Sequence, residues 1–308
     1  MIYKNNILPL LFAFVVLYSY QEVTAQTKVN VLDSYENAET PVLFYPGAIS
    51  INGIQWNNAL SRKNKVMFYC QQLPTRAQLV YQEFNGRSFN SPETIPFDTI
   101  YNYSDPYVNS KGDHMIFMAN IPYRISQDSV TSNFQLWQSH QVNKKWGKPE
   151  IVFPTAGSVG YPWRAKDSTL FFSMMPLDGS GKSNIYYAPY NNKKYSAPRA
   201  LPDNVNSKNR FEGDAYISPD KDFLIFVGFD RSDSQGYSDL YITFRIGENQ
   251  WTDPKSLGSN INSAGYDGSP YVTDDGRFLL FTSSRNSPGN NSFFNTYIVR
   301  FDKTNYMD

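Results

Sequence analysis

The chain of 308 residues carries 28 Lys and Arg residues and 28 Asp and Glu residues, so its formal net charge at pH 7 is zero. Aromatic residues make up 16% of the sequence, and charged residues make up 18% without a long block of one sign. Nucleic acids and anionic membranes are bound by clustered Lys and Arg, so neither partner is expected.

Residues 1–25 have the pattern of a signal peptide. Lys4 supplies a positive charge, residues 7–18 form an apolar stretch, and small residues at 23–25 precede a cleavage site before Gln26. An apolar stretch of about 12 residues is too short to span a bilayer. With no cysteine at the cleavage site, a lipoprotein is not expected. We predict an exported protein, periplasmic or secreted, with no membrane insertion after cleavage, a lead-in segment at 26–37 and a single domain over 38–308.

Two sequence signals recur along this domain. One is a turn followed by a short apolar run that ends in phenylalanine, and the other is an aromatic residue followed three positions later by proline. The phenylalanines are Phe68, Phe117, Phe172, Phe226 and Phe281, and the pairs are Phe89/Pro92, Trp146/Pro149, Tyr195/Pro198 and Trp251/Pro254. Successive phenylalanines lie 49 to 55 residues apart, which suits one propeller blade per repeat. Aromatic and β-branched runs between turn residues predict about four short strands in each unit.

The segment around Pro41 predicts how the ring closes. Pro41 is followed by the strand-forming residues 42–44, which resembles the proline and outer strand of the other units, although no complete unit precedes it. The fifth unit, by contrast, ends after a strand at 296–301 without such a proline. An open stack of sheets would expose two strand edges, which natural proteins avoid. We therefore predict an all-β fold, a five-bladed β-propeller whose last blade is completed by the N-terminal strand.

Cys70 is the only cysteine, so the chain has no intramolecular disulfide. It directly follows the apolar run at residues 66–69. A small buried thiol is expected there, and a reactive thiol is the alternative.

The fourth and fifth units resemble a known repeat. Residues 251–281 contain W-x-x-P-x-x-L-G followed by YDGSPYVTDDGRFLLF, and residues 211–226 read FEGDAYISPDKDFLIF. This pattern resembles the PD40 type of WD40-like repeat, found in TolB-like propellers of exported bacterial proteins. The match covers residues 196–300, whereas the first three units keep only the spacing. The resemblance implies a propeller, a periplasmic or secreted setting and commonly a binding role.

Carboxylates near the start of the predicted innermost strands form the candidate site. Aligning the units on their phenylalanines places Glu212 opposite Asp267, and gives Asp105 the position of Asp214. The start of an innermost strand borders the central channel, so carboxylates of different blades are expected to converge at one mouth. Two arginines that follow the next strand are candidates to pair with them. The candidate ligand-binding residues are Asp105, Glu212, Asp214, Asp267, Arg231 and Arg285.

Three roles are open for this cluster: turn capping with structural ion pairs, a ligand or cation site, and acid–base catalysis. Glycosidases need two carboxyl groups across the scissile bond, and arabinanase-like families take their base from the first blade, where residues 53–58 contain none. A metal-assisted lyase needs several histidines, and only His114 and His140 exist. The oxygens of residues 230–236 do not follow the alternation of a calcium loop. No metal and no cofactor are expected.

The sequence thus predicts an exported, non-catalytic propeller that binds a protein or a small polar ligand at the channel mouth. The alternative is a secreted polysaccharide-active propeller, of glycosidase or lyase type, or a glycan-binding one. Trp56 and Trp163, near innermost strands, are candidate platforms for stacking a sugar ring.

Overall fold

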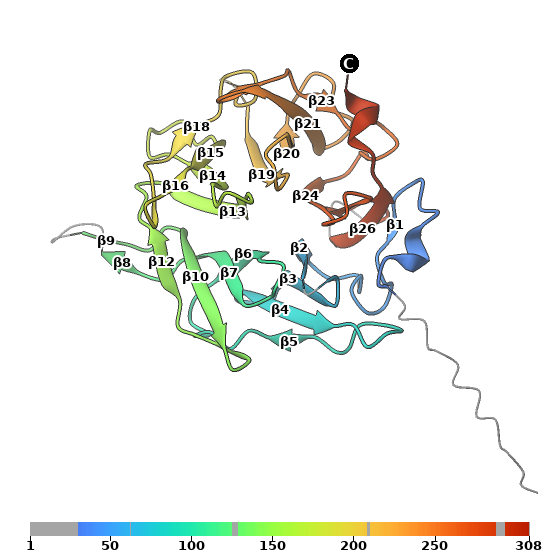
Figure 1. Ribbon diagram of the computed structural model, residues 1–308, viewed down its shortest axis with the longest axis horizontal. Helices are drawn as coiled ribbons and strands as arrows, with labels where there is room; N and C mark the ends of the chain where they lie inside the picture. Colours follow the sequence, from blue (N-terminus) through green and yellow to red (C-terminus); the bar gives the residue numbers. More distant parts are fainter. Residues whose placement is uncertain (1–29, 62, 125–128, 208–209, 288–292, 308) are drawn as a thin grey trace, which may run out of the picture.

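Five antiparallel sheets surround a central axis in the computed structural model (Figure 1). The structure describes residues 30–307 except 62, 125–128, 208–209 and 288–292, so the predicted signal peptide lies outside it. No helix within these ranges is long and apolar enough to cross a membrane. The prediction of an all-β, five-bladed propeller is confirmed.

Each blade contains four main strands, of which the first lies nearest the axis (Figure 1). Blade 1 consists of β2 (Gln55–Ser61), β3 (Val66–Gln72), β4 (Ala77–Glu83) and β5 (Glu93–Thr94). Blade 2 consists of β6 (Tyr103–Val108), β7 (His114–Ala119), β10 (Gln135–Val142) and β12 (Glu150–Phe153). Blade 3 consists of β13 (Ser158–Arg164), β14 (Leu170–Met175), β15 (Asn184–Ala188) and β18 (Arg199–Ala200). Blade 4 consists of β19 (Glu212–Ile217), β20 (Phe223–Phe229), β21 (Ser238–Gly247) and β23 (Lys255–Ser256).

Blade 5 joins the two ends of the described chain. It consists of β24 (Asp267–Val272), β25 (Phe278–Ser283), β26 (Asn295–Arg300) and β1 (Val42–Leu43). β1 pairs with β26 through Val42 opposite Ile298, and the amide of Phe44 donates to the carbonyl of Thr296 at 2.9 Å. The predicted closure of the ring by the N-terminal strand is confirmed.

Smaller elements decorate the blades. Two hairpins are inserted, one in blade 2 and one in blade 3, and two short strands extend β10 and β21. These are β8 (Tyr123–Arg124) with β9 (Val130–Thr131), β16 (Tyr190–Asn191) with β17 (Lys194–Tyr195), β11 (Lys145–Trp146) and β22 (Gln250–Trp251). Two 3-10 helices, η1 (Asp33–Tyr35) and η2 (Lys303–Tyr306), lie near the ends of the described chain.

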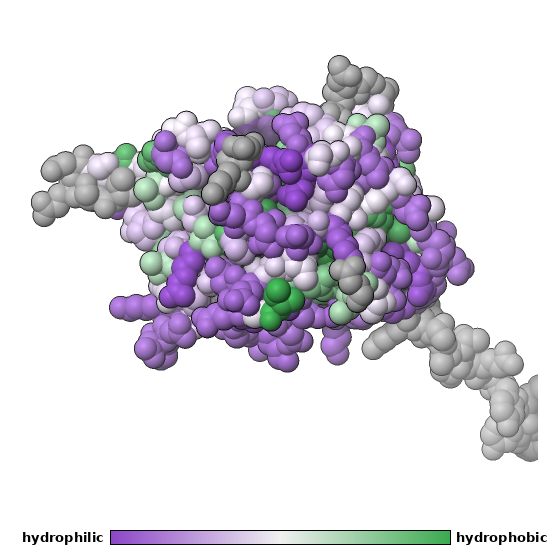
Figure 2. Space-filling model, turned by 90° about the horizontal axis from the view of Figure 1, so that it is seen from above, coloured by the Kyte–Doolittle hydropathy of each residue, from purple (hydrophilic) through white to green (hydrophobic). Residues whose placement is uncertain are grey.

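The repeated phenylalanines form the packing between blades. All five lie on the second strand of their blade and are 2% exposed or less. Because a propeller buries both faces of its sheets, this strand is apolar nearly throughout rather than alternating. The side of the ring seen in Figure 2 is covered mostly by hydrophilic residues, with hydrophobic residues in small separate groups.

Four aromatic rings fill the centre of the channel. Trp163 lies with its ring centroid 5.4 Å from Tyr107, 5.1 Å from Tyr216 and 5.4 Å from Tyr271. All four come from the same position of the innermost strands of blades 2 to 5, and blade 1 has the small Ala59 there. We call these four residues the aromatic plug. It separates the cavities at the two ends of the channel.

Cys70 lies in β3, is fully buried, and places its Sγ 3.6 Å from the carbonyl oxygen of Tyr103. Burial raises the pKa of its thiol well above the ordinary value, which disfavours the reactive thiolate. We expect a maleimide or disulfide reagent to label Cys70 only after denaturation. A thiol-labelling time course on native and urea-unfolded protein tests this, and rapid labelling of native protein would contradict it.

Candidate functional site

One residue in each innermost strand adopts a left-handed backbone conformation. These residues are Asn57, Asp105, Tyr161, Asp214 and Ser269, with φ between 47° and 56°. The pairing register between the first and second strands shifts at each of them. Such bulges re-aim side chains and are common beside functional sites. Five non-glycine residues therefore adopt an uncommon conformation at one level of the channel.

The bulges of blades 2, 3 and 4 contribute to a cavity of about 580 Å³ at one end of the channel. We call it the mouth cavity, and all five blades contribute to its wall. It is lined by Ile54, Trp56, Gln72, Ser104, Asp105, Met118, Tyr161, Asp214, Tyr266, Thr282 and Phe294. Most of the wall is aromatic or aliphatic, and its two charged groups are carboxyls. Ligand pockets commonly have this composition.

Asp105 is held by donors on both carboxylate oxygens. Its Oδ1 accepts hydrogen bonds from Nε1 of Trp56 at 3.0 Å and from Oγ of Ser104 at 2.7 Å. Its Oδ2 accepts from the backbone amide of Tyr161 at 3.3 Å, which links blades 2 and 3. Burial raises the pKa of Asp105, and these donors act in the opposite direction because they favour the ionised form.

Asp214, from blade 4, has fewer donors. Its Oδ2 accepts from the hydroxyl of Tyr266 at 3.0 Å. Burial, followed by repulsion from Asp105, raises its pKa to about 7. The mouth cavity therefore holds one carboxyl group that accepts several hydrogen bonds and a second whose pKa is raised toward neutral pH.

The other four predicted site residues form two ion pairs inside blades 4 and 5. Oε1 of Glu212 lies 3.3 Å from Nη1 of Arg231, and Oδ1 of Asp267 lies 2.9 Å from Nη2 of Arg285. Both carboxylates are fully buried. Each arginine lies over aromatic rings of its own blade, which offsets the cost of its partial burial. None of these four residues lines the mouth cavity, so the structure brings only Asp105 and Asp214 together there.

Among the side chains of this site that sequence analysis missed, three are aromatic. Tyr161 occupies a bulge position where other blades have Asp, Asn or Ser, and Tyr266 and Phe294 lie in connections outside the repeated strands. The repeat alignment matches Tyr161 with Asp105 and Asp214, but it does not show where the side chain of Tyr161 points. Trp56 was expected near an innermost strand, and its indole borders the cavity and donates to Asp105.

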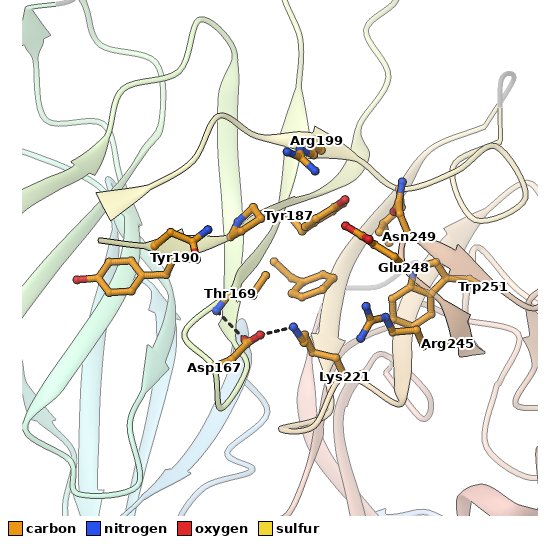
Figure 3. A pocket seen from close by; sticks show the side chains of 14 residues that line it. Asp167, Thr169, Tyr187, Tyr190, Arg199, Lys221, Arg245, Glu248, Asn249 and Trp251 are labelled. Atoms are coloured by element: carbon orange, nitrogen blue, oxygen red, sulfur yellow. Dashed lines mark hydrogen bonds and ion pairs between the residues drawn. The ribbon is translucent and has the colours of Figure 1, made fainter. Parts of the chain in front are cut away.

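A second cavity, of about 290 Å³, lies between blades 3 and 4 (Figure 3). Asp167 of blade 3 forms an ion pair with Lys221 of blade 4 at its edge. Arg199, Arg245 and Glu248 extend around the opening. Basic and acidic groups are thus mixed in this wall. Among the described residues, no group of three or more His, Cys, Asp or Glu is arranged to hold a metal ion.

No family model matches the chain, and no curated protein matches it in sequence. Similar solved structures include TolB from Acinetobacter baumannii, with TM-score 0.50 and 16% identity, covering 81% of this chain and 55% of that one. The chain therefore spans little more than half the length of that TolB. The catalytic domain of Coprinopsis cinerea GH62 alpha-L-arabinofuranosidase has TM-score 0.56 and 12% identity, covering 85% of this chain and 97% of that one. The endo-arabinase from Bacteroides thetaiotaomicron has TM-score 0.55 and 12% identity, covering 83% and 97%. At these identities the likeness concerns the fold alone.

Proposed function

We propose that this protein is an exported propeller that binds a small polar ligand in the mouth cavity. The observation that carries the proposal is the pairing of Asp105 and Asp214 across an aromatic cavity whose wall contains no Lys, Arg or His among the described residues. Two carboxyl groups removed from water repel each other, and Asp214 lacks most of the hydrogen-bond partners that Asp105 has. A ligand with hydroxyl or amine donors provides those partners.

Carbohydrate hydroxyls suit this cavity best. Sugars combine apolar ring faces, which stack on aromatic side chains, with hydroxyl groups, which donate to carboxylates. Trp56 is held in place by its own hydrogen bond to Asp105, so a stacking surface and an acceptor lie side by side. The GH62 arabinofuranosidase and the endo-arabinase share the fold and indicate which sugars to try first.

The proposal also includes export of the protein and its membership of the PD40 repeat family. The leader-like pattern of residues 1–25 supports a periplasmic or secreted protein without a lipid anchor. Membership of the PD40 repeat family is supported by the YDGSPY and FEGDAY motifs, whose acidic residues Asp267 and Glu212 form equivalent ion pairs in adjacent blades.

Substitutions in the mouth cavity test the binding site. We expect Asp105→Asn to weaken binding of arabino-oligosaccharides, measured by titration calorimetry, by about tenfold or more, because a charged acceptor contributes about 1.5–3 kcal/mol. Asp178→Asn, on an exposed turn, is the control and should leave the affinity unchanged. Equal affinity of both variants and the unchanged protein would place the ligand elsewhere.

Glycoside hydrolysis is the second candidate, favoured by the pKa of Asp214. An acid with a pKa of about 7 beside a second carboxyl group is the arrangement that glycosidases use. Incubation of the same oligosaccharides with the protein, followed by chromatography of the products, separates the two functions. Binding without release of sugar supports the binding protein, whereas turnover that is lost in both Asp105→Asn and Asp214→Asn supports the enzyme.

A further inference from the structure

A separate cavity between blades 2 and 3 has a wall with only basic charges. Its volume is about 670 Å³. Its basic residues are His114, His140, Arg164, Lys193 and Lys194, and no Asp or Glu of the described chain belongs to its wall. This composition is the reverse of that of the mouth cavity.

Arg164, the last residue of β13, is the central cation of this cavity. Its Nη1 lies 3.4 Å from Nδ1 of His114, and its guanidinium carbon lies 5.7 Å from the ring centroid of Tyr107. It also interacts with the hydroxyl of Tyr195: burial raises the pKa of this hydroxyl, and the charge of Arg164 acts in the opposite direction. These partners are neutral, and within the described chain no ion pair joins Arg164 to a carboxylate. Arg164 also borders a cavity lined by Asp113 and Asp274, but its partly buried charge has no carboxylate in direct contact within the described chain.

His114 positions Arg164 and does not add to the charge. Its Nε2 lies 3.1 Å from Oε1 of Gln138, so Nε2 carries the proton and Nδ1 accepts from Arg164. Burial, followed by the charge of Arg164, lowers the pKa of His114 to about 4. Its ring stacks on that of His140, with centroids 4.3 Å apart. Asp113 is close enough to act weakly on His114, but its carboxylate accepts from Nδ2 of Asn109.

The inserted hairpin β16–β17 brings two further cations to the opening. Lys193 and Lys194 are exposed on this hairpin and line the cavity. The neighbouring cavity of Figure 3 also has three basic residues, but there Asp167 and Glu248 offset two of them. The wall of the cavity between blades 2 and 3, as far as the structure describes it, has basic residues and no carboxylate.

We propose that the cavity between blades 2 and 3 binds a compact oxyanion, phosphate or sulfate, either free or as an ester. Arg164 carries five N–H donors in a planar fork, a shape that matches two oxygens of such an anion, and contacts with His114, Tyr107 and Tyr195 hold this fork in the wall. The lysines add attraction at the opening, and the hydroxyls of Tyr190 and Tyr195 can donate to further oxygens. This site is independent of the ligand proposed for the mouth cavity.

Titration calorimetry with inorganic phosphate, inorganic sulfate and their monomethyl esters tests the proposal. We expect at least one of these probes to bind, and Arg164→Gln to weaken it by about tenfold or more. Preference for the inorganic ions indicates a free anion as the natural ligand, and preference for an ester indicates a modified molecule. Arg199→Gln, in the cavity of Figure 3, is the matched control and should leave binding unchanged.

A second variant tests the site without changing a buried side chain, so that a loss of binding does not reflect a loss of folding. Lys193→Gln with Lys194→Gln changes only exposed side chains, and we expect it to weaken binding about threefold and to reduce its salt dependence. Failure of all four probes to bind the unchanged protein overturns the proposal. So does binding that survives Arg164→Gln in a folded protein, or that Arg199→Gln weakens equally.

Discussion

A chain that begins at Pro46 is expected to lose cooperative unfolding, because it lacks the strand that closes the ring. It loses β1 and with it Phe44, which is fully buried against Tyr35 and Phe89. Removing a buried phenylalanine alone costs about 3–5 kcal/mol, and total stabilities are about 5–15 kcal/mol. The edge of β26 also becomes free to pair with other chains. Urea unfolding followed by tryptophan fluorescence measures the effect, and light scattering measures association.

Two point variants separate the strand from its side chain. Phe44→Ala keeps the pairing of β1 with β26 and is expected to lower the free energy of unfolding by about 3–5 kcal/mol. Val42→Ala, at a position that is 39% exposed, should change it by less than about 1 kcal/mol. A shortened chain that unfolds at the same urea concentration as the full chain would show that closure contributes little.

Asp214→Asn is expected to stabilise the protein at pH 8 and to flatten its stability between pH 4 and 7. The pKa of Asp214 is about 7 in the folded protein, against about 3.9 in an unfolded chain. Between these values the folded state binds more protons, so the free energy of unfolding falls as pH rises. The contribution of the protonated group is complete below about pH 4 and is lost above about pH 7. Its full size is about 4 kcal/mol, and we expect the variant to regain about 1–3 kcal/mol at pH 8.

Urea unfolding at pH 4, 6 and 8 measures this dependence. Asp105 has a raised pKa as well, so part of the slope should remain in Asp214→Asn. Asp178→Asn, whose pKa is lowered by hydrogen bonds from Ser180, provides an exposed control and should not gain stability at pH 8. An Asp214→Asn variant that is less stable at pH 8 and keeps the full slope would show that Asp214 is ionised in the folded protein across this range.

The fold was predictable because its signals repeat. Each blade places a phenylalanine on its second strand, and the same buried position therefore appears five times in the sequence. Closure of the ring was predictable because the fifth unit lacks the proline that begins an outer strand, whereas the segment around Pro41 supplies one. Residues 26–37 were expected as a lead-in. Within their described part, Leu32 lies in the core and the hydroxyl of Tyr35 accepts from the amide of Tyr45. Because most residues around Leu32 and Tyr35 are polar, the sequence did not show that these two side chains pack against the propeller.

The site was only partly predictable because of the bulges. In a regular strand Glu212 and Asp214 would share one face, since side chains alternate. The left-handed backbone of Asp214 breaks that alternation, so Asp214 reaches the mouth cavity while Glu212 turns into the blade toward Arg231. Glycine is the residue most often found in the left-handed backbone conformation, but here the five positions hold Asn, Asp, Tyr, Asp and Ser. Asn and Asp adopt this conformation more readily than other non-glycine residues, but they are also common in ordinary turns, so their presence did not identify a bulge inside a strand.

The aromatic plug makes the mouth cavity a cup with one opening and not a tunnel. A molecule that enters beside Asp105 meets the rings of Trp163 and its neighbours before it can reach the far side, and it must leave by the way it came. A long polymer cannot be threaded along the axis of such a cup. A chain end, a side branch or a free small molecule can enter it, and a longer chain can reach Asp105 only by lying across the opening.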